Sequence, residues 1–143
     1  MIVYVVLAVL TGAALWIRLV PSDPARWHVD PGMIAVTDCA QLTTTGTLAR
    51  VSCLHRSETV ALLAALDGIA LETPRTIRLA GSAETGRITW VTRSFLWGFP
   101  DYTTAQAVQT PEGTRLDIVA RLRFGGYDRG VNGARLRVWL ARL

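Results

Sequence analysis

The first seventeen residues of this chain, Met1 to Ile17, carry no formally charged side chain. Continued to residue 20, the apolar segment has about the length that a helix needs to cross the hydrocarbon core of a bilayer, ~20 residues. Arg18 lies near its end, where a long side chain can place its guanidinium among lipid headgroups, and Trp16 is placed like an aromatic-belt residue. The sequence therefore predicts a membrane anchor over residues 1–20.

A cleaved signal peptide is the main alternative to this anchor. It would need a basic region before the apolar run and small residues around a cleavage site after it. No basic residue precedes the run, which ends in Leu-Trp-Ile-Arg-Leu-Val-Pro. We therefore expect an uncleaved, single-pass protein of a bacterial cell membrane.

The membrane side of the remaining chain follows less directly from the sequence. Arg18 and Arg26 both come after the span, and the positive-inside rule then favours a cytoplasmic domain. Small bacterial proteins with one N-terminal anchor more often expose their domain on the outside. We favour the periplasmic side on this second ground.

The charge pattern gives little reason to expect a nucleic-acid partner. The 15 basic residues are all arginines, but the net charge is only +4 and the arginines are spread along the chain. Cys39 and Cys53 are too few for a structural zinc site, so neither a metal nor another cofactor is expected. The two cysteines either pair, if the domain faces an oxidising compartment, or remain independent buried thiols.

Beyond the anchor, the prolines of residues 21–31 predict a tether to a globular domain at 32–143. Residues 32–51 look irregular, with a Thr-rich stretch that favours a loop or an edge strand. A helix is predicted between Ser57, its expected N-cap, and Asp67-Gly68, its expected end.

Alternating polar and apolar residues predict strands at 75–80, 87–94, 102–109 and 115–124. The chain ends in a second helix, with Asn132 as its expected N-cap and an apolar stripe formed by Leu136, Trp139, Leu140 and Leu143. Short turns between strands imply antiparallel pairing, and apolar helix stripes must cover a sheet. The predicted class is α+β: an N-terminal transmembrane helix, then a two-layer domain of about four antiparallel strands covered by two helices, with the opposite sheet face left polar.

The densest motif lies at residues 120–135 and reads Ala-Arg-Leu-Arg-Phe-Gly-Gly-Tyr-Asp-Arg-Gly-Val-Asn-Gly-Ala-Arg. It resembles the C-terminal signature of the domain-of-unknown-function family 1499. The matching positions are Arg121, Gly125, Asp128, Gly130, Val131, Asn132 and Arg135.

Two upstream segments, 92–94 and 99–102, also resemble that family, so the likeness covers about residues 58–143. Ala120 and Tyr127 replace serines of the signature, and the family's early Cys-Pro-x-Ser-Pro-Asn-Cys segment is not evident. The resemblance implies a small bacterial and plant domain, often preceded by an export or anchoring segment, and no established activity.

Candidate ligand-binding residues come from this motif and from the arginines of the strands. A cationic sheet face could receive an anionic small molecule, a lipid headgroup or a protein segment through bidentate contacts, or its arginines could be solvated or pair internally with aspartates such as Asp117. We also expect Arg121 and Asp128 to form a salt bridge that braces the loop between them. The candidates are Arg93, Asp101, Arg121, Asp128, Asn132 and Arg135.

The sequence therefore predicts a membrane-anchored binding or structural module of the cell envelope. The alternative is a hydrolase or isomerase built around Asp101, Asp128, Arg93 and Arg121, but no residue pattern identifies a catalytic group.

An uncleaved anchor predicts that the protein stays in the membrane fraction after a high-salt or carbonate wash. Burying the apolar side chains of residues 1–17 in lipid outweighs any surface electrostatic attraction that such washes remove. Immunoblotting of the washed fractions checks this. Soluble protein that has lost its N-terminus would establish a cleaved signal peptide instead.

Overall fold

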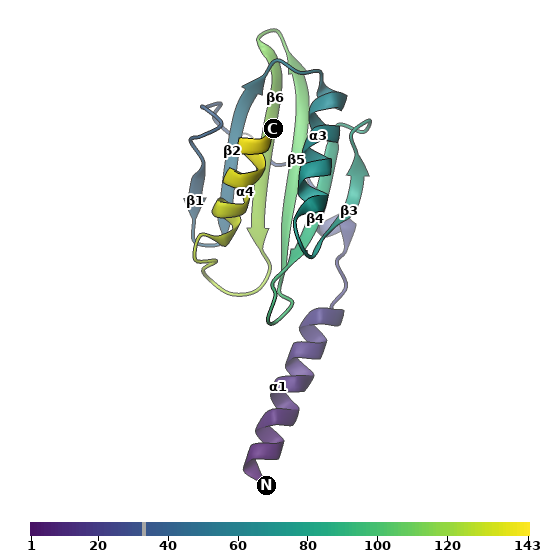
Figure 1. Ribbon diagram of the computed structural model, residues 1–143, viewed down its shortest axis with the longest axis vertical. Coiled ribbons are helices and arrows are strands. Elements are labelled where there is room, and N and C mark those ends of the chain that lie inside the picture. Colours follow the sequence, from purple (N-terminus) through teal and green to yellow (C-terminus); the bar gives the residue numbers. More distant parts are fainter. Residues whose placement is uncertain (33) are drawn as a thin grey trace.

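The computed structural model describes residues 1–32 and 34–143, and these form an apolar helix followed by an α+β domain (Figure 1). The domain contains one antiparallel sheet of six strands in the order β1-β2-β6-β5-β4-β3, with helices α3 and α4 on one face. The predicted class is confirmed, whereas the expected number of four strands is wrong. The elements are α1 (Ile2–Leu19), α2 (Pro24–Trp27), β1 (Thr43–Thr45), β2 (Leu48–His55), α3 (Thr59–Glu72), β3 (Thr76–Ser82), β4 (Arg87–Arg93), β5 (Pro100–Thr110), β6 (Gly113–Leu122) and α4 (Val131–Arg142).

Helix α1 leaves the domain and packs none of its residues into the core. Its 18 residues have a mean hydropathy of 2.1. Length and apolar character fit either a single membrane span or a signal sequence.

The four predicted strands are β3 to β6. Of the two missed strands, β1 lies within residues 32–51, the segment expected to be irregular, and β2 begins in it and continues to His55. β1 is a short edge strand, as the Thr-rich stretch allowed. β2 is an interior strand, paired with β1 on one side and β6 on the other. Its core-facing residues are the small side chains Ala49, Val51 and Cys53, and Ser52 on its other face is buried as well. The hydrophobic contrast along β2 is weak, because its inward residues are small and its outer face combines the exposed Leu54 with the buried Ser52.

The core lies between the sheet and the two helices. Leu116, Ile118 and Ala120 of β6 point into it as predicted, and all three are fully buried. Trp139 of α4 packs edge-on against Trp90 of β4, with ring centroids 5.6 Å apart. The predicted apolar stripe on the last helix is therefore the face that holds α4 on the sheet.

Helix α3 continues past its predicted end at Gly68 and stops at Glu72. A glycine inside a helix costs about 1 kcal/mol relative to alanine. Ile69 and Ala70 are buried, and that burial offsets the cost. Ser57 is not the N-cap either, because Glu58 occupies that position and makes no side-chain capping bond.

The prediction that Asn132 caps the last helix is wrong. Gly130 is the N-cap of α4, with a φ of 78°, and Asn132 is the second helical residue. Asp128 supplies the capping carboxylate instead: its oxygens accept hydrogen bonds from the backbone N–H groups of Gly130 (2.8 Å) and Asn132 (3.0 Å). An anion there also interacts favourably with the helix dipole.

The proline-rich segment 21–31 forms a strap across the sheet face opposite α3 and α4. Trp27 stacks on Tyr102 of β5, with ring centroids 3.9 Å apart and ring planes 9° from parallel. His28 Nδ1 shares a hydrogen bond with Thr89 Oγ1 at 2.9 Å. The segment expected to be a tether thus covers part of the sheet face that was expected to be left polar, and Trp27 and Tyr102 are buried there.

Cys39 and Cys53 form a disulfide, with the sulfur atoms 2.11 Å apart. The bond ties the loop before β1 to the middle of β2. Of the two alternatives that the sequence allowed for the cysteines, the structure has the paired one.

Replacing Asp128 with alanine should lower the free energy of unfolding by about 1 kcal/mol, because two backbone N–H groups at the start of α4 lose their acceptor. Asp128→Asn should cost less, since the amide oxygen can still accept. Thermal melting of the full-length protein in detergent measures both, with Glu112→Ala at an exposed turn as the control. An unchanged melting temperature for Asp128→Ala would contradict the capping role.

Candidate functional site

A cleft of about 470 Å³ opens between the C-terminal end of α3 and the first turns of α4. The C-terminal end of α3 and the start of α4 lie at the end of the domain from which α1 departs (Figure 1). We call this cleft the interhelix cleft. Its walls are mainly apolar and its polar groups are mainly arginines. The lining residues are Thr73, Pro74, Arg75, Thr92, Arg93, Ser94, Phe95, Asp101, Val131, Ala134, Arg135, Val138 and Trp139.

A buried ion pair lies at the inner wall of this cleft. Arg135 Nη2 is 3.3 Å from Asp101 Oδ2, and each side chain is 10% exposed. Arg135 Nη1 also donates to Asn132 Oδ1 at 2.8 Å. The structure thus brings together four of the six predicted site residues, because Asp128 caps the same turn.

Two buried polar atoms of this cluster have no hydrogen-bond partner among the described residues: Asp101 Oδ1 and Asn132 Nδ2. Leaving a buried donor or acceptor unpaired costs about 1–3 kcal/mol. Native structures satisfy most such groups, so two unpaired atoms in one cluster are an exception that singles this cluster out.

Burial raises the pKa of Asp101, and the nearby negative charge of Asp128 adds to the increase. Arg135 opposes the shift by its charge and hydrogen bond, and Asn132 opposes it by a weaker polar contact. Burial also lowers the pKa of Arg135, against the attraction of Asp101 and Asp128. Both shifts have the same physical cause, which is the loss of water around charged groups.

A second cleft, of about 520 Å³, lies on the other side of Asp101. It shares Ser94, Asp101 and Val131 with the interhelix cleft and extends between the Phe124 and Tyr127 side chains. Asp101 therefore borders two clefts at the same end of the domain.

Two further arginines stand at the rim of the interhelix cleft. Arg75 is exposed, and its Nε donates to the backbone oxygen of Arg93 at 3.0 Å. Arg93 extends from β4 toward α1, where its Nη1 donates to Gly98 O (3.0 Å) and Ile17 O (3.3 Å). Three arginines with one carboxylate leave the cleft with an excess of positive charge.

Arg121 lies apart from the other predicted site residues, on the sheet face under the strap. Its Nη2 donates to Trp27 O at 2.6 Å and to Thr104 Oγ1 at 3.0 Å, and its guanidinium lies 5.5 Å from the centre of the Trp27 ring. The predicted salt bridge with Asp128 is therefore wrong. The set Asp101, Asp128, Arg93 and Arg121, which the enzymatic alternative requires, does not converge on one cleft.

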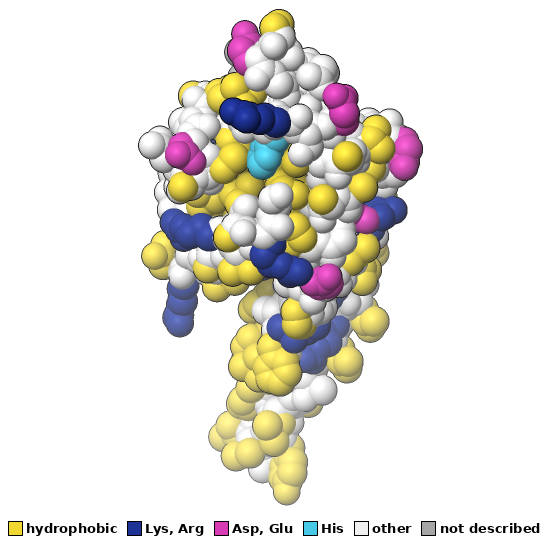
Figure 2. Space-filling model, turned by 45° about the horizontal axis from the view of Figure 1, so that its top comes forward, with side chains coloured by type: hydrophobic (Ala, Val, Ile, Leu, Met, Phe, Trp, Pro, Cys, Tyr) yellow, Lys and Arg dark blue, Asp and Glu magenta, His cyan; other side chains and the backbone are white. Residues whose placement is uncertain are grey.

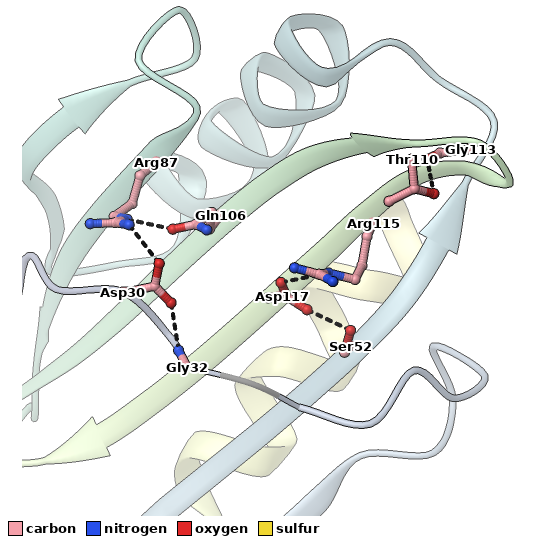
Figure 3. A network of polar contacts seen from close by, with 9 residues as sticks. All are labelled: Asp30, Gly32, Ser52, Arg87, Gln106, Thr110, Gly113, Arg115 and Asp117. Atoms are coloured by element: carbon pink, nitrogen blue, oxygen red, sulfur yellow. Dashed lines mark hydrogen bonds and ion pairs between the residues drawn. The ribbon is translucent and has the colours of Figure 1, made fainter.

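Two other arginines of the strap-covered face are also engaged. Figure 3 shows Arg87 between Asp30 of the strap and Gln106, and Arg115 paired with Asp117, which in turn accepts from Ser52. Of the alternatives open for this face, internal pairing is the one that the structure shows there. It excludes a free cationic sheet over these residues.

One further group of potential ligand atoms lies outside the clefts. The side-chain atoms of Cys39, Cys53 and His55 lie within 4.8 Å of one another, with His55 Nε2 3.3 Å from the Cys39 sulfur. Because both sulfurs are used in the disulfide, they are not available as thiolate ligands.

No protein-family model matches this chain, and no curated protein matches it significantly. The resemblance of the 120–135 motif to family 1499 therefore stays a prediction.

No sequence pattern identified Arg75 and Phe95 as part of the site, and Ser94 was noted only within the segment that resembles family 1499. Arg75 directly precedes β3, and Ser94 and Phe95 directly follow β4. These two strand ends are paired, since the backbone N–H of Arg93 donates to Arg75 O at 3.0 Å. The structure itself marks Arg75, whose φ of 60° is uncommon for a residue other than glycine.

The raised pKa of Asp101 predicts how the stability difference between the wild type and Asp101→Asn depends on pH. The folded protein binds this proton more tightly than the unfolded chain, so the contribution is complete below the ordinary value of 3.8 and is lost as the pH rises through the raised folded value. Urea unfolding at several pH values measures both proteins. The stability of the wild type relative to the variant should fall across this window, and a rise would contradict the assignment.

Proposed function

We propose that this protein is a single-pass protein of a bacterial cell membrane whose domain binds an anionic amphiphile in the interhelix cleft. The occupant is a lipid or another small molecule with an acidic head and an apolar body. Such a protein is one form of the membrane-anchored envelope module that the sequence predicts. Membership of family 1499 is a further part of the proposal.

The observation that carries the proposal is the composition of the cleft. Arg75, Arg93 and Arg135 supply cationic donors, while Val131, Val138 and Phe95 supply apolar wall. Arginine binds carboxylate and phosphate oxygens through two parallel N–H groups, and an apolar chain gains free energy by leaving water. A ligand with an acidic head and an apolar body can therefore bind the arginines through its head and the apolar wall through its body.

The disulfide supports the periplasmic side for the domain. Disulfides persist in oxidising compartments, including the bacterial periplasm, and are rare in the cytosol. The Cys39–Cys53 bond joins two segments of the domain itself, so the domain and not the anchor is the part that must face such a compartment.

Arg75→Gln should reduce the retention of phosphatidylglycerol several-fold, because the exposed rim arginine contributes charge without supporting the core. Native mass spectrometry of the full-length protein in detergent, with phosphatidylglycerol and phosphatidylcholine added together, measures the retained lipid. The wild type should keep more phosphatidylglycerol than phosphatidylcholine.

Arg56→Gln is the matched control, because Arg56 is exposed but follows β2, away from the cleft. It should leave the selectivity for phosphatidylglycerol unchanged. Equal retention of the two lipids by the wild type, or equal effects of the two substitutions, would overturn the proposal.

A further inference from the structure

The loop between β4 and β5 presents large apolar side chains to solvent beside the end of α1. Residues 94–99 read Ser-Phe-Leu-Trp-Gly-Phe, and Phe95, Leu96 and Trp97 are 79%, 66% and 39% exposed. Contiguous exposed apolar groups of this kind mark a surface that is covered by a partner or by a membrane. We call residues 94–99 the aromatic loop.

The aromatic loop is attached to the last turn of α1. Arg18 Nη2 donates to Leu96 O at 2.7 Å. The stem of Arg18 lies so close to Gly98 that a Cβ there would come within 2.6 Å of Arg18 Cγ, and Gly98 also has a φ of 74°. Arg93 joins the same two segments by donating to Gly98 O and to Ile17 O.

This attachment fixes the height of the loop relative to the membrane. In a spanning α1, Arg18 marks the headgroup level, because its guanidinium must leave the hydrocarbon core. Trp16 lies two residues deeper in the segment and is 61% exposed, as an interfacial residue would be. A loop bonded to Arg18 through its own backbone lies at that same level.

The charges around the loop suit a lipid surface. Figure 2 shows arginine side chains gathered where the apolar helix meets the domain. The Arg75 guanidinium lies 5.4 Å from the centre of the Phe95 ring, and that of Arg123 lies 5.2 Å from the Phe124 ring. Aromatic groups with adjacent arginines are the combination that binds the boundary between headgroups and acyl chains.

We infer that the aromatic loop inserts Phe95, Leu96 and Trp97 into the headgroup–acyl boundary of the same membrane that α1 spans. The domain then has two fixed contacts with the bilayer, and the interhelix cleft, which Phe95 also lines, opens at the lipid surface. This inference rests on the proposed transmembrane role of α1, but it does not require that the cleft bind a lipid.

The test is quenching of tryptophan fluorescence by brominated lipids in the full-length protein, reconstituted into phosphatidylcholine–phosphatidylglycerol vesicles. The emission of Trp97 is obtained by subtracting the emission of the Trp97→Phe variant from that of the wild type. We expect this emission to fall when bromine is placed on the acyl chains, and to fall more when the bromine is near the headgroup than when it is near the chain end.

Two further differences serve as references. The difference between the wild type and Trp16→Phe gives the emission of Trp16 in the anchor, which brominated lipids should quench. The difference between the wild type and Trp27→Phe gives the emission of a ring that is 7% exposed and stacked on Tyr102, which the lipids should not quench. Phe95→Ser should weaken the quenching of Trp97, whereas Leu54→Ser, at an exposed position on β2, should not.

The outcomes separate the inference from the proposals on which it is built. Quenching of Trp16 without quenching of Trp97 overturns the insertion of the loop, including the case in which a protein partner covers it. Absence of quenching at both residues overturns the transmembrane role of α1 and the inference together. Quenching of Trp97 in a protein that shows no preference for phosphatidylglycerol supports the insertion of the loop. That result overturns only the proposal that the interhelix cleft binds an anionic amphiphile.

Discussion

The arrangement of this molecule depends on the need to cover the second face of a six-stranded sheet. Helices α3 and α4 cover one face. The other carries Val91, Tyr102 and the hydroxyls of Thr89 and Thr104, which are also buried. The strap supplies the cover, with Trp27 stacked on Tyr102 and its carbonyl accepting from Arg121. An aromatic stack of this kind contributes about 0.5–1.5 kcal/mol beyond the burial of its area.

This cover determines where the anchor leaves the domain. Only a few residues separate Trp27 from the end of α1, so α1 departs close to the strap, beside the β4–β5 loop and the end of β6. Arg123 holds the connection by donating to Pro21 O at 2.7 Å, and Ser22 shares a hydrogen bond with the Tyr102 hydroxyl. The position of α1 beside the aromatic loop and the clefts is thus a consequence of how the sheet buries its second face.

The sequence predicted those parts of the fold that follow from local periodicity. β6 alternates strictly and was found with the correct inward face, and the stripe on α4 identified Leu136 and Trp139 as core. β2 was missed because its inward residues are small and its outward Ser52 is buried beside Asp117. Gly68 misled the prediction for α3, since burial of the following residues overrides the intrinsic preference of a glycine to end a helix.

The candidate site was predicted less well, because its membership depends on which sheet face each residue occupies. Asp101, Asp128, Asn132 and Arg135 meet because β5 and the start of α4 adjoin on the helix side. Arg121 belongs to the opposite face, where the strap occupies it, and the identity of its partner, a backbone carbonyl 94 residues away in the chain, leaves no trace in local pattern. Long-range pairing of this kind is set by packing and not by spacing.

The stability of the fold alone does not account for the buried Asp101–Arg135 pair. Two charges buried together lose their hydration, and well-packed apolar residues of similar volume are often as stabilising or more so. Here the pair is also incompletely satisfied, with Asp101 Oδ1 and Asn132 Nδ2 unbonded among the described residues. Asp101 borders two clefts, but both unbonded atoms are themselves buried, so the side chains around them must move before a ligand could reach them. A buried pair with unsatisfied atoms beside a cleft is a candidate functional site on physical grounds, although structural ion-pair networks produce the same desolvation and pKa shifts.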